Sequence, residues 1–138
     1  MAVTLPIRLR RRLGAAALAV VALVSASLVT AGSAAAQELR LLMIEQVGCV
    51  YCAAFNRDIA PAYEVSPEGQ AAPLIRADLR GPLPEGVTLA SRPFVTPTFI
   101  LLGPDGVEVG RLTGFPGQDF FWPYVNEMID RARTQPNG

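Results

Sequence analysis

Cys49 and Cys52 are the only cysteines of this chain, and they stand two residues apart in the stretch EQVGCVYCAAF. This placement leaves three interpretations open, namely a metal site, a structural disulfide or a redox pair. A structural disulfide would close a very small loop and contribute little stability. Two thiolates supply only half of a tetrahedral zinc site, and the chain contains no histidine. Cu(I) accepts two thiolates, and Met43 could lie near them, so copper handling stays an alternative.

The first 36 residues differ in composition from the rest of the 138-residue chain. Four arginines precede an apolar run over residues 13–29, and small residues follow up to Ala36. This order is typical of a secretory signal peptide, with cleavage expected between Ala36 and Gln37. The alternative is an uncleaved membrane anchor, because the run approaches the ~20 residues that cross a bilayer. We expect residues 37–138 to form one domain exported to the periplasm, where a disulfide can persist.

The charge of the predicted domain limits its partners. It holds eight arginines and 12 carboxylates, a formal net charge near −4, and no lysine or histidine. A mildly acidic domain without a basic patch argues against nucleic acid as a partner. The lack of histidine removes the commonest general base and the commonest metal ligand. We therefore expect no metal or other cofactor. We also expect a monomer, and isomerase activity is disfavoured because no separate dimerisation domain is present.

Apolar runs and turn signals predict an α/β domain. The expected elements are a strand at 39–46, a helix at 49–63 that Pro61 kinks or ends, a strand at 72–79, a hairpin of strands 98–102 and 107–112 around Pro-Asp-Gly, and a helix at 118–133. Residues 66–69 (SPEG) indicate a turn, and the Gly- and Pro-rich residues 81–93 a surface excursion with one helical turn near 87–90. This order gives one mixed sheet of about four strands flanked by helices.

The cysteine pair falls between the first predicted strand and the first predicted helix. A C-x-x-C at that place in a βαβ pattern is typical of a redox site. Cys49 would lie at the helix N-terminus, where free N–H groups and the helix dipole stabilise a thiolate. The thiolate is the attacking species in disulfide exchange, and Cys52, one turn on, would be the shielded, resolving thiol. These residues predict a thiol–disulfide oxidoreductase.

A second motif, Val95-Thr96-Pro97-Thr98-Phe99, places a proline at the mouth of a buried strand. Together with Cys49-Val50-Tyr51-Cys52 and with Gly114 before the last helix, it makes residues 39–133 resemble the thioredoxin superfamily. The resemblance implies a trimmed thioredoxin-like fold, without the strand and helix that open thioredoxin. It also implies that Pro97 is cis and packs beside the disulfide, and that the Thr96 backbone pairs with an extended segment of a substrate protein.

A narrower resemblance rests on EQVGCVYC and the later stretch RLTGFPG. Together they are similar to small exported thioredoxin-like proteins associated with bacterial sulfur-oxidation (Sox) systems. Thioredoxin itself has Gly-Pro between its cysteines and a buried aspartate in the preceding strand. Here Val50-Tyr51 and Met43 stand at those places.

Glu45 is the acid nearest to the cysteines in the sequence. It could accept a proton from Cys52 if its side chain points inward, and otherwise it is an exposed residue at a strand end. Tyr51 could contact substrate proteins or simply cover the sulfurs. Phe94, Phe115 and Pro116 are candidates for an apolar rim around the site, with ordinary loop packing as the alternative.

The direction of electron flow follows from the residues between the cysteines. Val50 and Tyr51 carry no charge, whereas an oxidant needs an unusually stabilised thiolate. We therefore expect a reductase of disulfides in partner proteins, which would draw its electrons from a membrane thiol donor. A thiol oxidant and a Cu(I)-binding chaperone are the alternatives.

Overall fold

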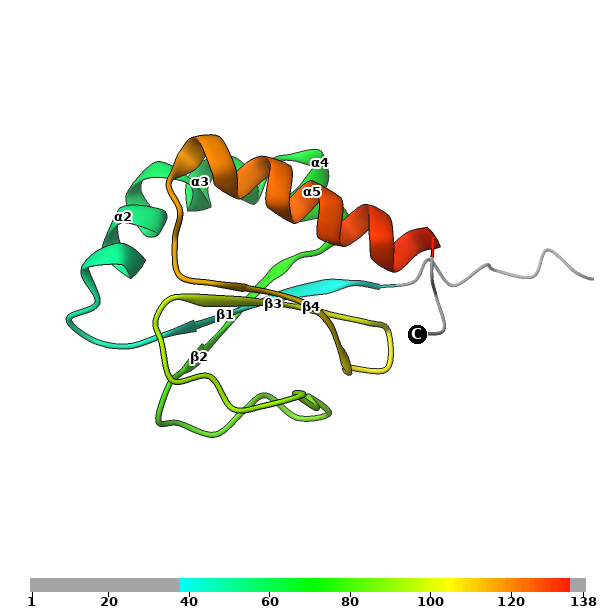
Figure 1. Ribbon diagram of the computed structural model, residues 1–138, viewed down its shortest axis with the longest axis horizontal. Helices are drawn as coiled ribbons and strands as arrows, with labels where there is room; N and C mark the ends of the chain where they lie inside the picture. Colours follow the sequence, from blue (N-terminus) through cyan, green and yellow to red (C-terminus); the bar gives the residue numbers. More distant parts are fainter. Residues whose placement is uncertain (1–37, 135–138) are drawn as a thin grey trace, which may run out of the picture. The chain divides into compact units, whose positions relative to one another are not determined.

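The structure is a computed structural model, and it describes residues 38–134. The predicted signal peptide at residues 1–36 and its cleavage site lie outside the described residues. Within them, the strands form one mixed sheet in the order β2-β1-β3-β4 (Figure 1). These strands are β1 (Arg40–Glu45), β2 (Leu74–Asp78), β3 (Thr98–Leu102) and β4 (Glu108–Thr113). β1 pairs in parallel with β2 and antiparallel with β3, and β4 pairs antiparallel with β3.

The helices cover one face of this sheet (Figure 1). They are α2 (Val50–Asp58), α3 (Ala60–Tyr63), α4 (Pro67–Ala71) and α5 (Gln118–Thr134). None of the helices between residues 38 and 134 is long and apolar enough to span a membrane. The mixed four-stranded sheet with flanking helices confirms the predicted trimmed thioredoxin-like α/β fold.

Alternation along the central strands divides the core into two parts, because successive side chains of a strand point to opposite faces. On the helix-covered face, Leu41 and Met43 of β1 pack with Phe55 of α2. On the other face, Leu42 and Ile44 pack with apolar residues of β2 and β3.

No helix covers this second face within the described residues. Residues 79–97, here called the crossover segment, connect β2 to β3 on the side of the sheet away from the helices (Figure 1). Leu79, Leu83, Val87 and Leu89 of this segment pack against the second part of the core. The crossover segment therefore covers this face of the sheet, as the helices cover the opposite face.

Four local predictions need correction. The expected helix at 49–63 is divided at Ile59, where φ is −119° and ψ is −48°, so Pro61 lies in the first turn of a separate α3. A proline is tolerated there because first-turn N–H groups have no helical partner. Residues 67–69 belong to α4 rather than to a turn, and Ser66 is its N-cap, since the Ser66 hydroxyl accepts the Gly69 N–H over 3.0 Å.

The crossover segment forms no helical turn near residues 87–90; instead Thr88 bridges Val107. In α5, helical spacing predicts one apolar stripe made of Phe121, Tyr124, Val125, Met128 and Ile129. All of them except Tyr124 are buried. Tyr124 is instead 42% exposed. The helix turns this position toward the β4 side of its surface, where Tyr124 lines a hollow with Val109 and Gly110.

Candidate active site

A tight turn between β1 and α2 sets the position of Cys49. Gly48 has a φ of +80°, which glycine adopts without steric cost, and the Cys49 N–H donates to the Gln46 carbonyl over 3.3 Å. Cys49 itself is extended and is the N-cap of α2. Its Sγ accepts the backbone N–H of Cys52 over 3.1 Å. The first cysteine therefore lies at the helix N-terminus, as the sequence predicts.

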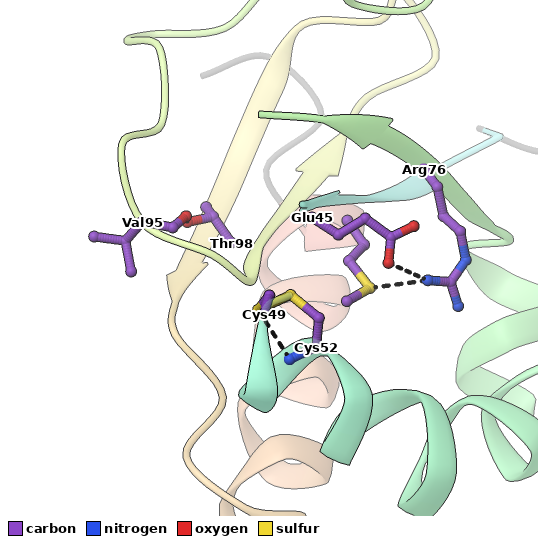
Figure 2. The surroundings of a disulfide bond; sticks show 7 residues. Glu45, Cys49, Cys52, Arg76, Val95 and Thr98 are labelled. Atoms are coloured by element: carbon purple, nitrogen blue, oxygen red, sulfur yellow. Dashed lines mark hydrogen bonds and ion pairs between the residues drawn. A yellow bond between two sulfur atoms is a disulfide. The ribbon is translucent and has the colours of Figure 1, made fainter. Parts of the chain in front are cut away.

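The two cysteines are joined by a disulfide, with their Cα atoms 5.2 Å apart (Figure 2). Cys52 is 4% exposed and packs in the helix-side core, whereas Cys49 is only partly buried. This difference leaves Cys49 as the more accessible sulfur. An incoming nucleophile or disulfide can reach Cys49, and Cys52 can act only from within.

The structure confirms one feature that the resemblance implies for the second motif, the cis peptide bond before Pro97. The Thr96–Pro97 peptide bond is cis, and Pro97 is buried just before β3. Two hydrogen bonds hold this turn: Gly114 N–H donates to the Pro97 carbonyl and Thr98 Oγ1 to the Val95 carbonyl, each over 2.8 Å. Figure 2 shows Val95 and Thr98 in the surroundings of the disulfide. Within residues 38–134, the Thr96 backbone N–H and C=O have no hydrogen-bond partner.

Glu45 ends β1 and turns toward Arg76 of β2, as Figure 2 shows. The Arg76 Nη1 atom lies 2.9 Å from Glu45 Oε2 and 3.3 Å from the sulfur of the fully buried Met43. The Glu45 side chain is 28% exposed, so it is neither deeply buried nor free in solvent. It lines a hollow of about 370 Å³ together with Cys49 and Cys52. The sequence indicates Glu45 as a candidate proton acceptor, but it does not indicate that Arg76 is the ion-pair partner of Glu45.

The same geometry bears on the copper alternative. The cation of Arg76 lies beside the Met43 sulfur, which disfavours Met43 as a ligand for a second cation. Among the described residues, no group of three or more His, Cys, Asp or Glu side chains could hold a metal ion.

Large apolar side chains are exposed in the turn before Cys49, in the first turn of α2 and in the segment before Pro97. Val47 is fully exposed, Val50 and Tyr51 are 77% and 64% exposed, and Phe94 is 88% exposed. The position of Phe94 agrees with the expected apolar rim. Phe115 differs, because its ring packs edge-on against the core residue Phe55 with 5.8 Å between centroids. The exposure of Val47 and Val50 is not predicted from the sequence, although their positions close to the turn glycine Gly48 could have indicated that they are exposed.

A helix-capping cysteine bonded to a buried cysteine one turn on, with a cis-proline turn preceding a central strand, is the arrangement of thioredoxin-like thiol–disulfide oxidoreductases. A search of solved structures matches the periplasmic thioredoxin SoxS from Paracoccus pantotrophus, crystallised in its reduced form. The two chains share 54% sequence identity over 69% of this chain and 99% of that one, with a TM-score of 0.66. A scan of protein-family models gave no match, and a search of the curated proteins gave none either.

This chain therefore belongs to the thioredoxin superfamily and is a thiol–disulfide oxidoreductase similar to the periplasmic thioredoxin SoxS. The predicted family, fold and enzyme class are confirmed.

Proposed function

We propose that this protein is exported to the periplasm and reduces disulfides in partner proteins there, with Cys49 as the nucleophile. The observation that carries the proposal is the contrast between a partly exposed Cys49 at the N-terminus of α2 and a buried Cys52. Residues 1–36 would be its signal peptide and 37–138 the exported domain. The arginine-then-apolar order of the leader and the periplasmic location of the Paracoccus relative support export.

The reaction that we propose has two exchange steps. The Cys49 thiolate attacks one sulfur of the partner's disulfide, the partner's S–S bond breaks, and its other sulfur leaves as a thiolate that takes up a proton. Cys52 then loses its proton and attacks the Cys49 sulfur, which releases the second partner thiol. Two electrons pass to the partner, and the protein ends with the Cys49–Cys52 disulfide seen in the structure.

Glu45 is our candidate for the group that takes the Cys52 proton in the second step. Glu45 lines the same hollow as both cysteines, and the ion pair with Arg76 holds its carboxylate at the end of β1. A water molecule in this hollow could connect the carboxylate to the otherwise shielded thiol. No histidine is present in the chain to do this instead.

The partner would dock across the cis-proline turn. The Thr96 backbone groups, which have no partner within residues 38–134, can pair with an extended segment of the substrate protein while Pro97 fixes the turn. The exposed Tyr51 ring lies directly between the two cysteines in sequence and offers apolar surface for that segment. We assign substrate binding to Thr96, Pro97 and Tyr51.

Two observations favour reduction over oxidation as the direction. The residues between the cysteines, Val50 and Tyr51, are exposed and carry no charge. The Cys49 sulfur accepts a single hydrogen bond within the described residues, from the Cys52 N–H. A strong oxidant needs a more stabilised thiolate. The protein would act as a monomer, receive electrons from a membrane thiol donor, and serve partner proteins of a bacterial sulfur-oxidation system.

The reduction potential of the purified protein tests the direction. Thiol labelling across glutathione buffers should give a value below roughly −220 mV, among the reducing members of the range for such proteins. A value above roughly −150 mV would identify an oxidant and reverse the proposed electron flow. Equilibration that takes hours would instead argue against redox catalysis.

A further inference from the structure

A clamp of charged residues at the edge of the sheet fastens the crossover segment, far along the chain from the cysteines. Arg111 of β4 donates two hydrogen bonds of 2.7 Å to the Glu108 carboxylate, from Nε and Nη2. Its Nη2 also donates to the Ser91 carbonyl over 2.7 Å, and the Ala90 N–H donates to Glu108 Oε2 over 2.9 Å. We call Arg111 and Glu108 the edge clamp.

Strand register explains why both clamp residues face the crossover segment. Glu108 is paired with Leu102 and Arg111 with Ile100, and cross-strand neighbours lie on the same face of a sheet. Leu102 and Ile100 belong to the second part of the core, which the crossover segment covers. The Glu108 side chain is 10% exposed and the Arg111 side chain is 22% exposed, so solvent competes little for their hydrogen bonds.

The clamp fixes one end of the short stretch that enters the active site. Ser91 is held by Arg111 upstream, and Pro97 is held by Gly114 downstream. Pro93 and Pro97 are buried, whereas Phe94 and Val95 between them are exposed. A stretch this short cannot shift much while both of its ends are pinned. Arg92 also donates to the Leu79 and Gly81 carbonyls at this end, so the clamp shares the anchoring with it. Release of the clamp should loosen the backbone around Thr96 without freeing it.

We propose that Arg111 and Glu108 are positioning residues that hold the Thr96–Pro97 turn in the orientation that a protein partner needs. This inference rests on the proposed docking of partner proteins at Thr96. The clamp makes no contact with either cysteine, so it should leave the sulfur chemistry alone. Its loss should therefore weaken the use of protein disulfides and spare small disulfides, which need no groove.

The test compares the full chain as wild type, Arg111→Gln, Glu108→Gln and Arg131→Gln. Arg131 is a matched control, an arginine on α5 that is 60% exposed and lies 3.6 Å from Glu127. With insulin as the protein disulfide, KM should rise about tenfold in both clamp variants while kcat stays within about twofold. The rate with the small disulfide DTNB and the reduction potential should match wild type, and Arg131→Gln should match it throughout.

Amide hydrogen exchange at Phe94, Val95 and Thr96 gives a readout that needs no turnover. Exchange there should accelerate in Arg111→Gln and in the milder Glu108→Gln, which can still accept the Ala90 N–H. Unchanged exchange and unchanged KM for insulin in the folded variants would overturn the positioning role. If wild type itself fails to discriminate insulin from DTNB, the docking proposal fails, and exchange alone then decides whether the clamp holds the turn.

Discussion

The sulfur of Cys49 accepts the backbone N–H of Cys52 over 3.1 Å, so one atom both caps helix α2 and forms the disulfide. Helix N-caps are usually Ser, Thr, Asp or Asn oxygens, and here sulfur takes that place. On reduction, the same N–H should stay directed at the atom that becomes the thiolate and should lower the cost of forming that charge. The cap and the proposed nucleophile are therefore the same atom.

Replacement of the buried cysteine should trap the first intermediate. In Cys52→Ser, Cys49 can still attack a partner's disulfide, but no second thiol is present to release it. We expect a mixed disulfide that survives non-reducing electrophoresis and disappears with dithiothreitol. Cys49→Ser is the matched control, since it retains a thiol that is only 4% exposed, and it should trap little partner. Equal trapping by the two variants would contradict the assignment of Cys49 as nucleophile.

Loss of the exposed ring between the cysteines should weaken partner binding. Tyr51→Ala removes a side chain that is 64% exposed, so the fold should keep its stability within about 0.5 kcal/mol. KM for a protein disulfide should rise about threefold to tenfold, because a contact aromatic contributes on the order of 1 kcal/mol. Val65→Ala removes a similarly exposed side chain at 76% and should change nothing. An unchanged KM for Tyr51→Ala would mean that the ring only covers the sulfurs and does not bind the partner.

The elements with strong local signals could be predicted from the sequence. The run around Leu101 is a fully buried strand, the run around Leu41 is a strand buried except at its two ends, and the Pro-Asp-Gly turn joins β3 and β4 as expected. The division of the helix at Ile59 was harder to predict, because Pro61 fits equally well inside the first turn of a new helix. Residues 66–69 predict a turn, whereas Ser66 is the N-cap of α4. A serine before a proline fits both a turn and a helix start.

The candidate site was predictable only where its residues are close in sequence or carry a motif. Cys49, Cys52 and Pro97 satisfied that condition. Arg76 did not, because its position beside Met43 depends on the parallel register of two strands 33 residues apart. The pairing of Arg111 with Ser91 likewise depends on the path of a segment without regular secondary structure. Register and loop path come from tertiary packing, which periodicity does not encode.

Removal of the proposed proton acceptor should slow the second exchange step. Glu45→Gln retains the shape of the side chain and loses its basicity, so the mixed disulfide should resolve about a hundredfold more slowly, the lower end of general-base effects. Stopped-flow mixing with quenching by acid would measure this step separately from the first attack, which should be unaffected. Glu64→Gln, which changes an exposed acid just after α3, is the control. Resolution at the wild-type rate would mean that solvent takes the proton.

The hydroxyl of Tyr63 should contribute measurably to stability. Tyr63 is fully buried, its hydroxyl donates to the Ala72 carbonyl over 2.8 Å, and burial raises the pKa of its phenol. Tyr63→Phe leaves that carbonyl without this donor and should lower the free energy of unfolding by about 1 kcal/mol. Urea denaturation would measure the change, with Tyr124→Phe on the exposed side of α5 as a control. A neutral Tyr63→Phe would show that another donor replaces the hydroxyl.

Acid should weaken the edge clamp before it unfolds the rest of the domain. Burial alone would raise the pKa of Glu108, but hydrogen bonds from Arg111 and the Ala90 N–H, with the charge of Arg111, lower that pKa below its ordinary 4.5. A carboxylate whose pKa is lower in the folded state stabilises the fold above its unfolded pKa. That contribution is lost as the pH falls through the folded pKa. Stability should therefore decline below about pH 4.5 partly through this group.

Urea unfolding of wild type and Glu108→Gln at pH 7, 5, 4 and 3 would measure this contribution. The difference in unfolding free energy should be largest at pH 7 and should shrink steadily toward pH 3, because protonated Glu108 resembles glutamine in charge. Glu127→Gln, whose carboxylate is 63% exposed and 3.6 Å from Arg131, should show little difference at any pH. A Glu108→Gln difference that stays constant with pH would mean that the side chain acts through packing rather than through its charge.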